Sequence, residues 1–392
     1  MREPTVDNPT LLADDVRAVA TALLAAHLPL SADGYKVTTA LLSDVLLHAA
    51  ATGTSVEAAC DTLLDAADAN TVRGYLNEQF EIEDLLALEH RFNQALGSDL
   101  PRKVRRAPLN IAIDTHDQPF YGKSAELRAV ACRGKAREGT TYFIRIASAY
   151  VMRNGVRITL ALAFVRPSDA MKDVVAALTD RVRELGLRIQ CLWLDRGFAS
   201  VDVVEALRLG KVPAVIAWPI RGKRGGTRAL CCGRGSALRN YAIRRANGGY
   251  CEVMMAVVRL REITVRQAWM LFALIGCVMT PNQVRERYRQ RFGIESSYRQ
   301  ARQVRIRTNT RNPALRFVYL GLALILVNIW TLLRFRFCQI PRRGRSGRPL
   351  DPTRFKLRHL AAFLRLAIER HRGILDHIHA TTLPRMAESV VH

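Results

Sequence analysis

The chain has 392 residues, 49% of them hydrophobic and 24% charged, a composition that excludes a disordered protein and allows two or three domains. Lysine and arginine number 59 against 35 acidic residues, so the formal net charge is +24. Such an excess calls for a polyanionic partner, with nucleic acid as the leading class and an anionic membrane surface as the alternative. The eight cysteines contain no Cys-x-x-Cys pair, which indicates reduced thiols in a cytoplasmic protein rather than a zinc site or a disulfide framework.

Residues 1–106 are rich in alanine, leucine and acidic side chains and are predicted to be helical. One short capped helix is expected after Thr54 and a second from Ala69 to Phe80. Two short helices with a tight joint resemble a helix-turn-helix, whose second helix would present Arg73 to DNA. A plain helical bundle explains this pattern equally well. A helical DNA-binding domain is therefore the hypothesis for this segment.

Residues 107–219 change to short apolar runs separated by helical patterns. Strands are expected at 109–113, 141–152, 156–165, 189–194 and 213–218, with helices at 168–185 and 200–209. The second and third strands are joined by Arg153-Asn-Gly, a favourable hairpin turn. This order predicts a mixed sheet with helices on its faces, within an α/β protein.

Residues 220–277 interrupt this pattern and are predicted to form a β-rich insertion with a basic rim, with strands at 241–245 and 250–260. Residues 278–340 then hold a helix from Pro281 to about Arg307 and an apolar helix from Ala314 to Arg336. The apolar helix is at the short limit for a membrane span, and we interpret it as a buried core helix. Residues 341–392 are a basic linker and a cationic amphipathic helix.

Two aspartates, Asp114 and Asp195, each follow an apolar strand directly. Strand ends are where sites are commonly assembled, although aspartate is also favoured there as a cap or turn residue. Asp117 is a rival to Asp114 but lies farther along, before Pro119. His116 could join a metal site or transfer protons, but a neutral histidine bonded to the strand end is the preferred interpretation.

A third acid, Glu295, lies in an arginine-rich helix. Positions 288, 291, 295, 299 and 302 share one helical face, which displays Tyr288, Arg291, Glu295, Arg299 and Arg302. Local pairing of Glu295 with Arg299 contributes only a few tenths of a kcal/mol and leaves the other arginines unexplained. Phosphodiester chemistry explains them better, because three carboxylates can hold two divalent metal ions roughly 3.5–4 Å apart while arginines bind the flanking phosphates.

Together these residues resemble a known family. Asp114, Asp195 in the run LDRGF, and Glu295 are similar to a DDE site on an RNase H-like fold. The spacing of Tyr288, Arg291, Glu295 and Arg302 resembles the Tyr-Arg-Glu-Lys signature of insertion-sequence transposases of the IS-four type, with arginine in place of the lysine. The runs PFYGK and RFGIESSYR are similar to the branch first known from haloarchaeal insertion sequences. The resemblance extends from about residue 40 to residue 340.

The resemblance implies a cut-and-paste transposase that binds the terminal inverted repeats of an insertion sequence in double-stranded DNA. Asp114, Asp195 and Glu295 would hold Mg²⁺, with Mn²⁺ able to substitute, and Tyr288, Arg291 and Arg302 would contact DNA. The protein would act as a homodimer on DNA, associated with the nucleoid in the cytoplasm and not with a membrane. The implied architecture is an RNase H-like catalytic core with a β-rich insertion. Trp218 and Trp269 are candidates there for stacking on a base, although core packing is the preferred interpretation for both.

Three alternatives stay open at this stage. The first is a catalytically inactive or repurposed transposase that acts as a DNA-binding protein. The second is a metal-dependent nuclease, which would use the same acids without end recognition or strand transfer. The third, a membrane-associated basic protein, depends only on the apolar helix and the cationic C-terminal helix.

Overall fold

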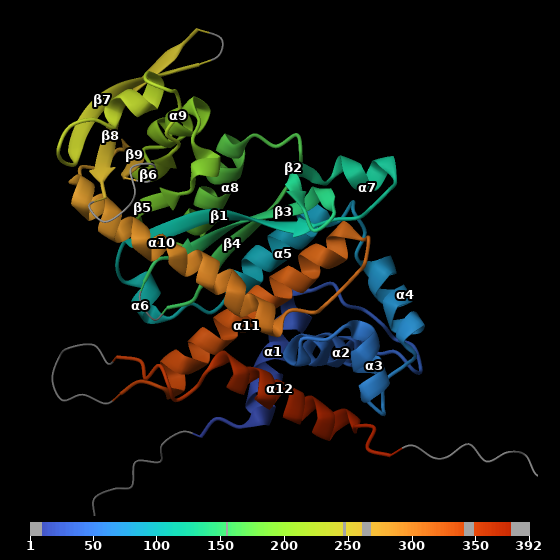
Figure 1. Cartoon of the computed structure of the whole chain (residues 1–392). Coiled ribbons are helices and arrows are strands. Elements are labelled where there is room, and N and C mark those ends of the chain that lie inside the picture. Colours follow the sequence, from blue (N-terminus) through green and yellow to red (C-terminus); the bar gives the residue numbers. More distant parts are fainter. Residues whose placement is uncertain (1–9, 154–155, 246–247, 261–267, 341–348, 378–392) are drawn as a thin grey trace, which may run out of the picture.

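A computed structural model describes residues 10–153, 156–245, 248–260, 268–340 and 349–377. The strands of this part form one nine-stranded sheet in the order β2-β3-β1-β5-β6-β9-β8-β7, with β4 also paired to β3 (Figure 1). Part of the predicted Arg153-Asn-Gly turn and the start of the predicted basic linker, residues 341–348, lie outside the described residues. The mixed α/β class predicted from the sequence is confirmed.

The centre of the sheet is formed by five strands in the order β4-β3-β1-β5-β6. They are β1 (Leu109–Pro119), β3 (Thr140–Val151), β4 (Thr159–Val165), β5 (Ile189–Leu194) and β6 (Ala214–Trp218). β1, β5 and β6 are parallel, whereas β3 pairs antiparallel with both β1 and β4. The apolar runs that predicted these strands are buried on both faces, as expected for a sheet covered by helices on two sides.

The segment predicted as an insertion extends this sheet. β7 (Ala237–Arg244) and β8 (Tyr250–Arg259) match the two predicted strands approximately, and β9 (Trp269–Ile275) joins β8 to the central β6 by antiparallel pairing. β9 was not predicted from the sequence, and neither were β2 (Cys132–Arg137) and α7 (Ala125–Ala129). β2 pairs with β3, and β9 pairs with β6 and β8.

Helices cover the two faces of the sheet. α8 (Met171–Glu184) and α9 (Val201–Leu209) share one hydrophobic core with one face, while α10 (Pro281–Ala301) and α11 (Pro313–Phe337) share the other. α10 begins with a capping box between Thr280 and Gln283 and crosses the sheet (Figure 1). It ends six residues before the predicted Arg307, and residues 302–304 form one 3₁₀ turn, η4 (Arg302–Val304).

The apolar helix α11 is a core helix of the protein. By length and composition it could cross a membrane, but 94% of its most apolar window is buried inside the protein. Its polar residues have structural partners: the side-chain amide of Asn328 accepts from the Thr159 N–H at 3.0 Å and donates to the Thr159 carbonyl at 2.8 Å. Asn93 forms the same pair of bonds with Leu162. These two amides thus satisfy the backbone along the open edge of β4.

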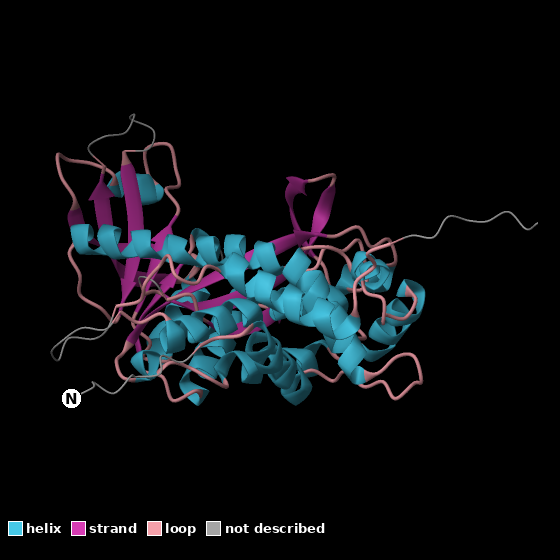
Figure 2. Ribbon diagram, turned by 90° about the horizontal axis from the view of Figure 1, so that it is seen from below, coloured by secondary structure: helices cyan, strands magenta, loops and turns pink. Residues whose placement is uncertain are grey.

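The N-terminal helices lie against this helical layer (Figures 1 and 2). They are α1 (Ala13–His27), α2 (Thr39–Thr52), α3 (Val56–Thr62), α4 (Ala69–Gln79), α5 (Leu85–Gly97) and α6 (Arg102–Arg105). α12 (Leu357–Arg372), from the other end of the chain, packs on α1 and α2. The fully buried Asp44 of α2 accepts from Arg17 of α1 and Arg372 of α12, each at 2.8 Å. Both ends of the described chain therefore share one hydrophobic core with α10 and α11.

Candidate active site

Asp114 and Asp195 lie side by side where two parallel strands part. The last paired residues of β1 and β5 are Ile113 and Leu194, and each aspartate is the next residue in its chain. β1 does not end at Ile113 as predicted, because its antiparallel pairing with β3 continues from Asp114 to Pro119. Asp114 is therefore held inside a strand, whereas Asp195 caps the 3₁₀ turn η1 (Arg196–Phe198) by accepting from the Arg196 N–H.

Glu295 approaches the two aspartates from α10, and Arg291 of the same helix contacts all three acids. One terminal nitrogen of Arg291 lies 3.0 Å from Asp114. The other lies 3.2 Å from Glu295 and 3.9 Å from Asp195. The Arg291 side chain is 5% exposed, compared with 13% for Asp114, 40% for Asp195 and 46% for Glu295. The acids predicted from three distant parts of the sequence thus converge on one buried cation.

The surroundings of Asp114 disfavour its ionised form, although Arg291 is its ion-pair partner. Burial raises the pKa of Asp114 to about 6, and the nearby Asp195 adds to the rise, while Arg291 opposes it. Burial also raises the pKa of Tyr288 to about 12, so its hydroxyl stays protonated. The Tyr288 ring lies 5.1 Å from the Arg291 guanidinium, and Arg291 Nε has no hydrogen-bond partner among the residues that the structure describes. Additional positive charge would stabilise the ionised Asp114.

The donor chemistry of the site fits a divalent ion. Three carboxylates that already share one cation offer the oxygen ligands that Mg²⁺ prefers. Among the described residues, no group of three or more His, Cys, Asp or Glu side chains is arranged to hold a metal ion, because the three acids meet Arg291 instead. A metal ion bound by these acids would therefore compete with Arg291 for their oxygens.

The other polar residues of β1 have defined partners. Asp117, the rival to Asp114, forms a two-pronged ion pair with Arg145 at 2.7 and 3.0 Å. Burial lowers the pKa of His116 to about 4, and Arg305 and Arg302 lower it further, so His116 is neutral at ordinary pH. Its ring stacks on Tyr298 with centroids 4.7 Å apart. The interpretation of His116 as a neutral side chain agrees with this environment.

The arginines predicted to contact DNA occupy different places. Arg299 and Arg302 are exposed along the end of α10, on the helical face that carries Glu295. Arg73 is exposed on α4, where its guanidinium bonds to Asn70 and lies 3.9 Å from Glu57. Arg305 and Arg307 were not singled out from the sequence, yet they line cavities next to Arg302 and Arg73 respectively.

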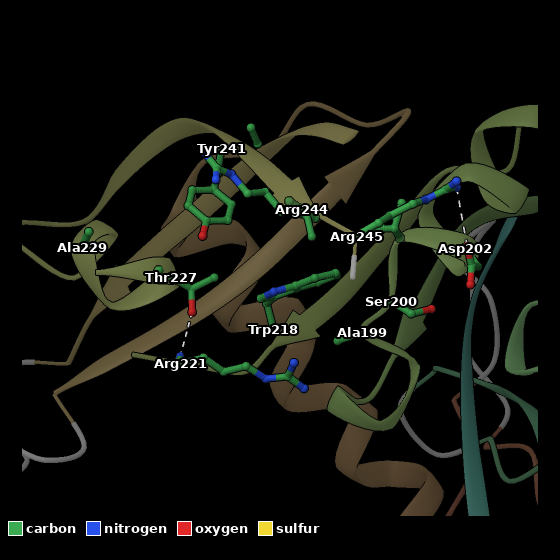
Figure 3. A pocket seen from close by; sticks show the side chains of 14 residues that line it. Ala199, Ser200, Asp202, Trp218, Arg221, Thr227, Ala229, Tyr241, Arg244 and Arg245 are labelled. Atoms are coloured by element: carbon green, nitrogen blue, oxygen red, sulfur yellow. Dashed lines mark hydrogen bonds and ion pairs between the residues drawn. The ribbon is translucent and has the colours of Figure 1, made fainter. Parts of the chain in front are cut away.

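A larger cavity of about 1150 Å³ lies on the side of the sheet that carries α9. The Trp218 ring faces this cavity, with Tyr241 and the arginines Arg221 and Arg244 around it (Figure 3). One wall begins at Ala199, four residues after Asp195. The second stacking candidate, Trp269, is instead partly covered by Arg259, whose guanidinium lies 5.6 Å from its ring.

The fold and the site together define a mixed α/β protein with an acidic centre at the junction of its central strands and a basic surface around it. The model of the family described as "Transposase DDE domain" matches residues 106–329, more than half of the chain, and the chain belongs to this family. That stretch contains all three acids, and enzymes of this family generally use divalent metal ions.

The chain is also similar in fold to a solved structure of a piggyBac transposase synaptic complex with hairpin DNA. The TM-score is 0.56 at 10% sequence identity, and the match covers 93% of this chain and 78% of that one. No curated protein matches the sequence.

Proposed function

We propose that this protein is a cut-and-paste transposase that cleaves DNA at the terminal inverted repeats of an insertion sequence and joins the freed ends to a target. The observation that carries the proposal is the convergence of Asp114, Asp195 and Glu295 on Arg291 inside the transposase domain. The central strand order, with three parallel strands beside two antiparallel ones, supports an RNase H-like core.

Asp114, Asp195 and Glu295 would hold the divalent ions, Mg²⁺ with Mn²⁺ as a substitute. When bound, such ions activate a water or a 3′-hydroxyl and stabilise the leaving oxygen. Arg291, which contacts all three acids, would then be released to bind a phosphate of the substrate. Tyr288 packs against Arg291 and orients it, and a protonated hydroxyl allows Tyr288 to donate to the DNA.

The surroundings of the acids support the remaining parts of the proposal. Arg299 and Arg302 continue the face of Glu295 and are available to the DNA backbone. Trp218 faces a cavity rimmed by arginines near Asp195, an arrangement suited to stacking on an unpaired base (Figure 3). Cutting two ends together calls for a homodimer on DNA. The net charge of +24 suits that assembly.

The first experiment is cleavage of the repeats that flank this gene, in Mg²⁺, by the wild type and by Glu295→Gln. The matched control is Glu286→Gln, because Glu286 is an exposed acid on the same helix, away from the acidic centre. Nicks at the repeat ends that persist in the control and vanish in Glu295→Gln support the proposal. If the wild type binds the repeats but does not cut them in Mg²⁺ or Mn²⁺, the protein is a DNA-binding relative without catalysis.

A further inference from the structure

The segment between α10 and α11 holds a row of arginines on a fixed backbone. Arg302, Arg305, Arg307 and Arg311 lie within ten residues of one another. Between them, Val304 and Ile306 are fully buried in the hydrophobic core, at 0% and 1% exposure. The Arg307 N–H also donates to the Thr54 carbonyl at 2.9 Å. The alternation places Arg305 and Arg307 on the outer side of an anchored extended segment.

Two cavities meet along this segment. The first, about 550 Å³, borders the end of β1 from His116 to Pro119 and is also lined by Arg302 and Arg305. The second, about 810 Å³, borders α4. Both are lined by Arg307, Thr308, Asn309 and Tyr319, so the two cavities share a wall formed by these residues. We call the two cavities together the arginine groove, which is defined by residues 116–119, 302, 305–309 and the α4 residues Asn70, Arg73 and Asn77.

The groove carries positive charge that the protein itself does not neutralise. Five arginines line its first cavity: Arg137, Arg302, Arg305, Arg307 and Arg316. The acids there are Glu138 and Asp117, and Asp117 is already paired with Arg145, outside the cavity. Among the residues that the structure describes, no ion pair forms to Arg302, Arg305 or Arg307.

Burial and mutual repulsion act on these arginines together. Burial lowers the pKa of Arg305, and the neighbouring Arg302 lowers it further. Burial likewise lowers the pKa of Arg316, with Arg305 contributing. Burial of the neighbouring like charges of Arg305 and Arg316 is costly unless an anion binds to them. The groove also offers neutral donors, Asn309 and Thr308, of the type that bind phosphate and sugar oxygens.

We propose that the arginine groove binds the phosphodiester backbone of the DNA strand that leaves the acidic centre and directs it to α4. At one end His116 lies two residues beyond Asp114 in β1, and Arg302 lies two helical turns beyond Glu295 on the same face of α10. At the other end of the groove, Arg73 and Asn77 of α4 line the wall of the second cavity. This inference rests on the proposed function, because it takes the scissile phosphate to lie at the three acids.

The test compares the salt dependence of DNA binding in two double variants. Arg305→Gln/Arg307→Gln removes two charges from the groove. Arg181→Gln/Arg183→Gln removes two charges from α8, which packs on the opposite face of the sheet and where these arginines pair with Glu184 and Asp180 of the same helix. Binding of a fluorescein-labelled duplex of the flanking repeat is measured by anisotropy in EDTA, over a range of salt concentrations.

Each lost phosphate contact reduces the magnitude of the negative slope of log K against log salt by about 0.9, so the slope of the groove variant is expected to be less steep by about 2. The α8 variant is expected to keep the wild-type slope. Arg305→Lys/Arg307→Lys, which retains the charge, should keep it too, and this separates loss of charge from misfolding. If the groove and α8 variants have equal slopes and the wild type binds and cuts the repeat, the inference is overturned and the proposed function stays intact. A wild type that neither binds nor cuts would overturn both.

Discussion

The opposed titrations of Asp114 and His116 lead to a prediction that needs no DNA. Both side chains belong to β1, and burial disfavours the charged form of each. The pKa of Asp114 rises from 3.8 to about 6, so the folded protein loses stability as pH increases between these values. The pKa of His116 falls from 6.5 to about 4, so the folded protein loses stability as pH decreases between these values.

The two effects are similar in size and opposite in sign. A shift of about 2 units corresponds to about 3 kcal/mol at 1.36 kcal/mol per unit. For a chain of 392 residues, with an unfolding entropy of about 2 cal/mol/K per residue, this amounts to about 4 °C in melting temperature. In the wild type the two contributions to the pH dependence of stability largely cancel between pH 4 and 6.5. Replacing one of the two residues therefore reveals the contribution of the other.

Melting temperatures of the wild type, Asp114→Asn and His116→Gln are therefore measured from pH 4 to 7 in EDTA. Asp114→Asn is expected to gain stability with increasing pH, because only the histidine effect remains, and His116→Gln is expected to lose it. Titrating groups that interact with neither Asp114 nor His116 act equally in the three proteins and cancel in the differences. Three parallel curves would refute the reasoning, since they would show that neither side chain is desolvated as described.

Three further predictions concern single contacts. Asp44→Asn should lower the free energy of unfolding by about 3–5 kcal/mol, because the partly buried Arg17 and Arg372 lose their shared carboxylate partner. Asp65→Asn, at the exposed end of this network, should change the free energy of unfolding by less than about 0.5 kcal/mol. Urea melts of the two variants and the wild type measure both differences. Asn328→Leu should cost about 1–3 kcal/mol by leaving the Thr159 N–H unpaired, measured in the same way, and a neutral result would contradict the bonding described for β4. Arg291→Gln should increase the melting-temperature rise caused by Mn²⁺, because the ion no longer competes with a guanidinium; an unchanged rise would exclude that competition.

The sequence was sufficient to predict most of the elements that hold the acids. Asp114 and Asp195 follow apolar runs that form buried strands, and Glu295 lies on a helical face whose period is visible in the sequence. The contact of Arg291 with all three acids could not be predicted, because it depends on how α10 crosses the sheet. Side-chain direction across such a crossing is set by tertiary packing and not by spacing along the chain.

The arginine groove was missed for a different reason. The helix predicted from the sequence extends to about Arg307, which would place Arg305 and Arg307 on different faces of a helix. The alternation of Val304 and Ile306 with arginines has a period of two, which is the period of an extended segment, and the structure follows it. β9 was missed because it lies in the predicted insertion, and its place in the sheet depends on pairing with β6 and β8.

The burial of Asp44 between Arg17 and Arg372 has a consequence for the synthesis of the protein. α12 leaves the ribosome long after α1 and α2, yet it packs directly on both of them. Until α12 emerges, the apolar surface of α2 that it covers stays open, and Asp44 lacks one of its two cations. Copies of the gene shortened at the 3′ end should therefore produce chains that aggregate or are degraded, rather than folded competitors that occupy DNA ends without cutting them.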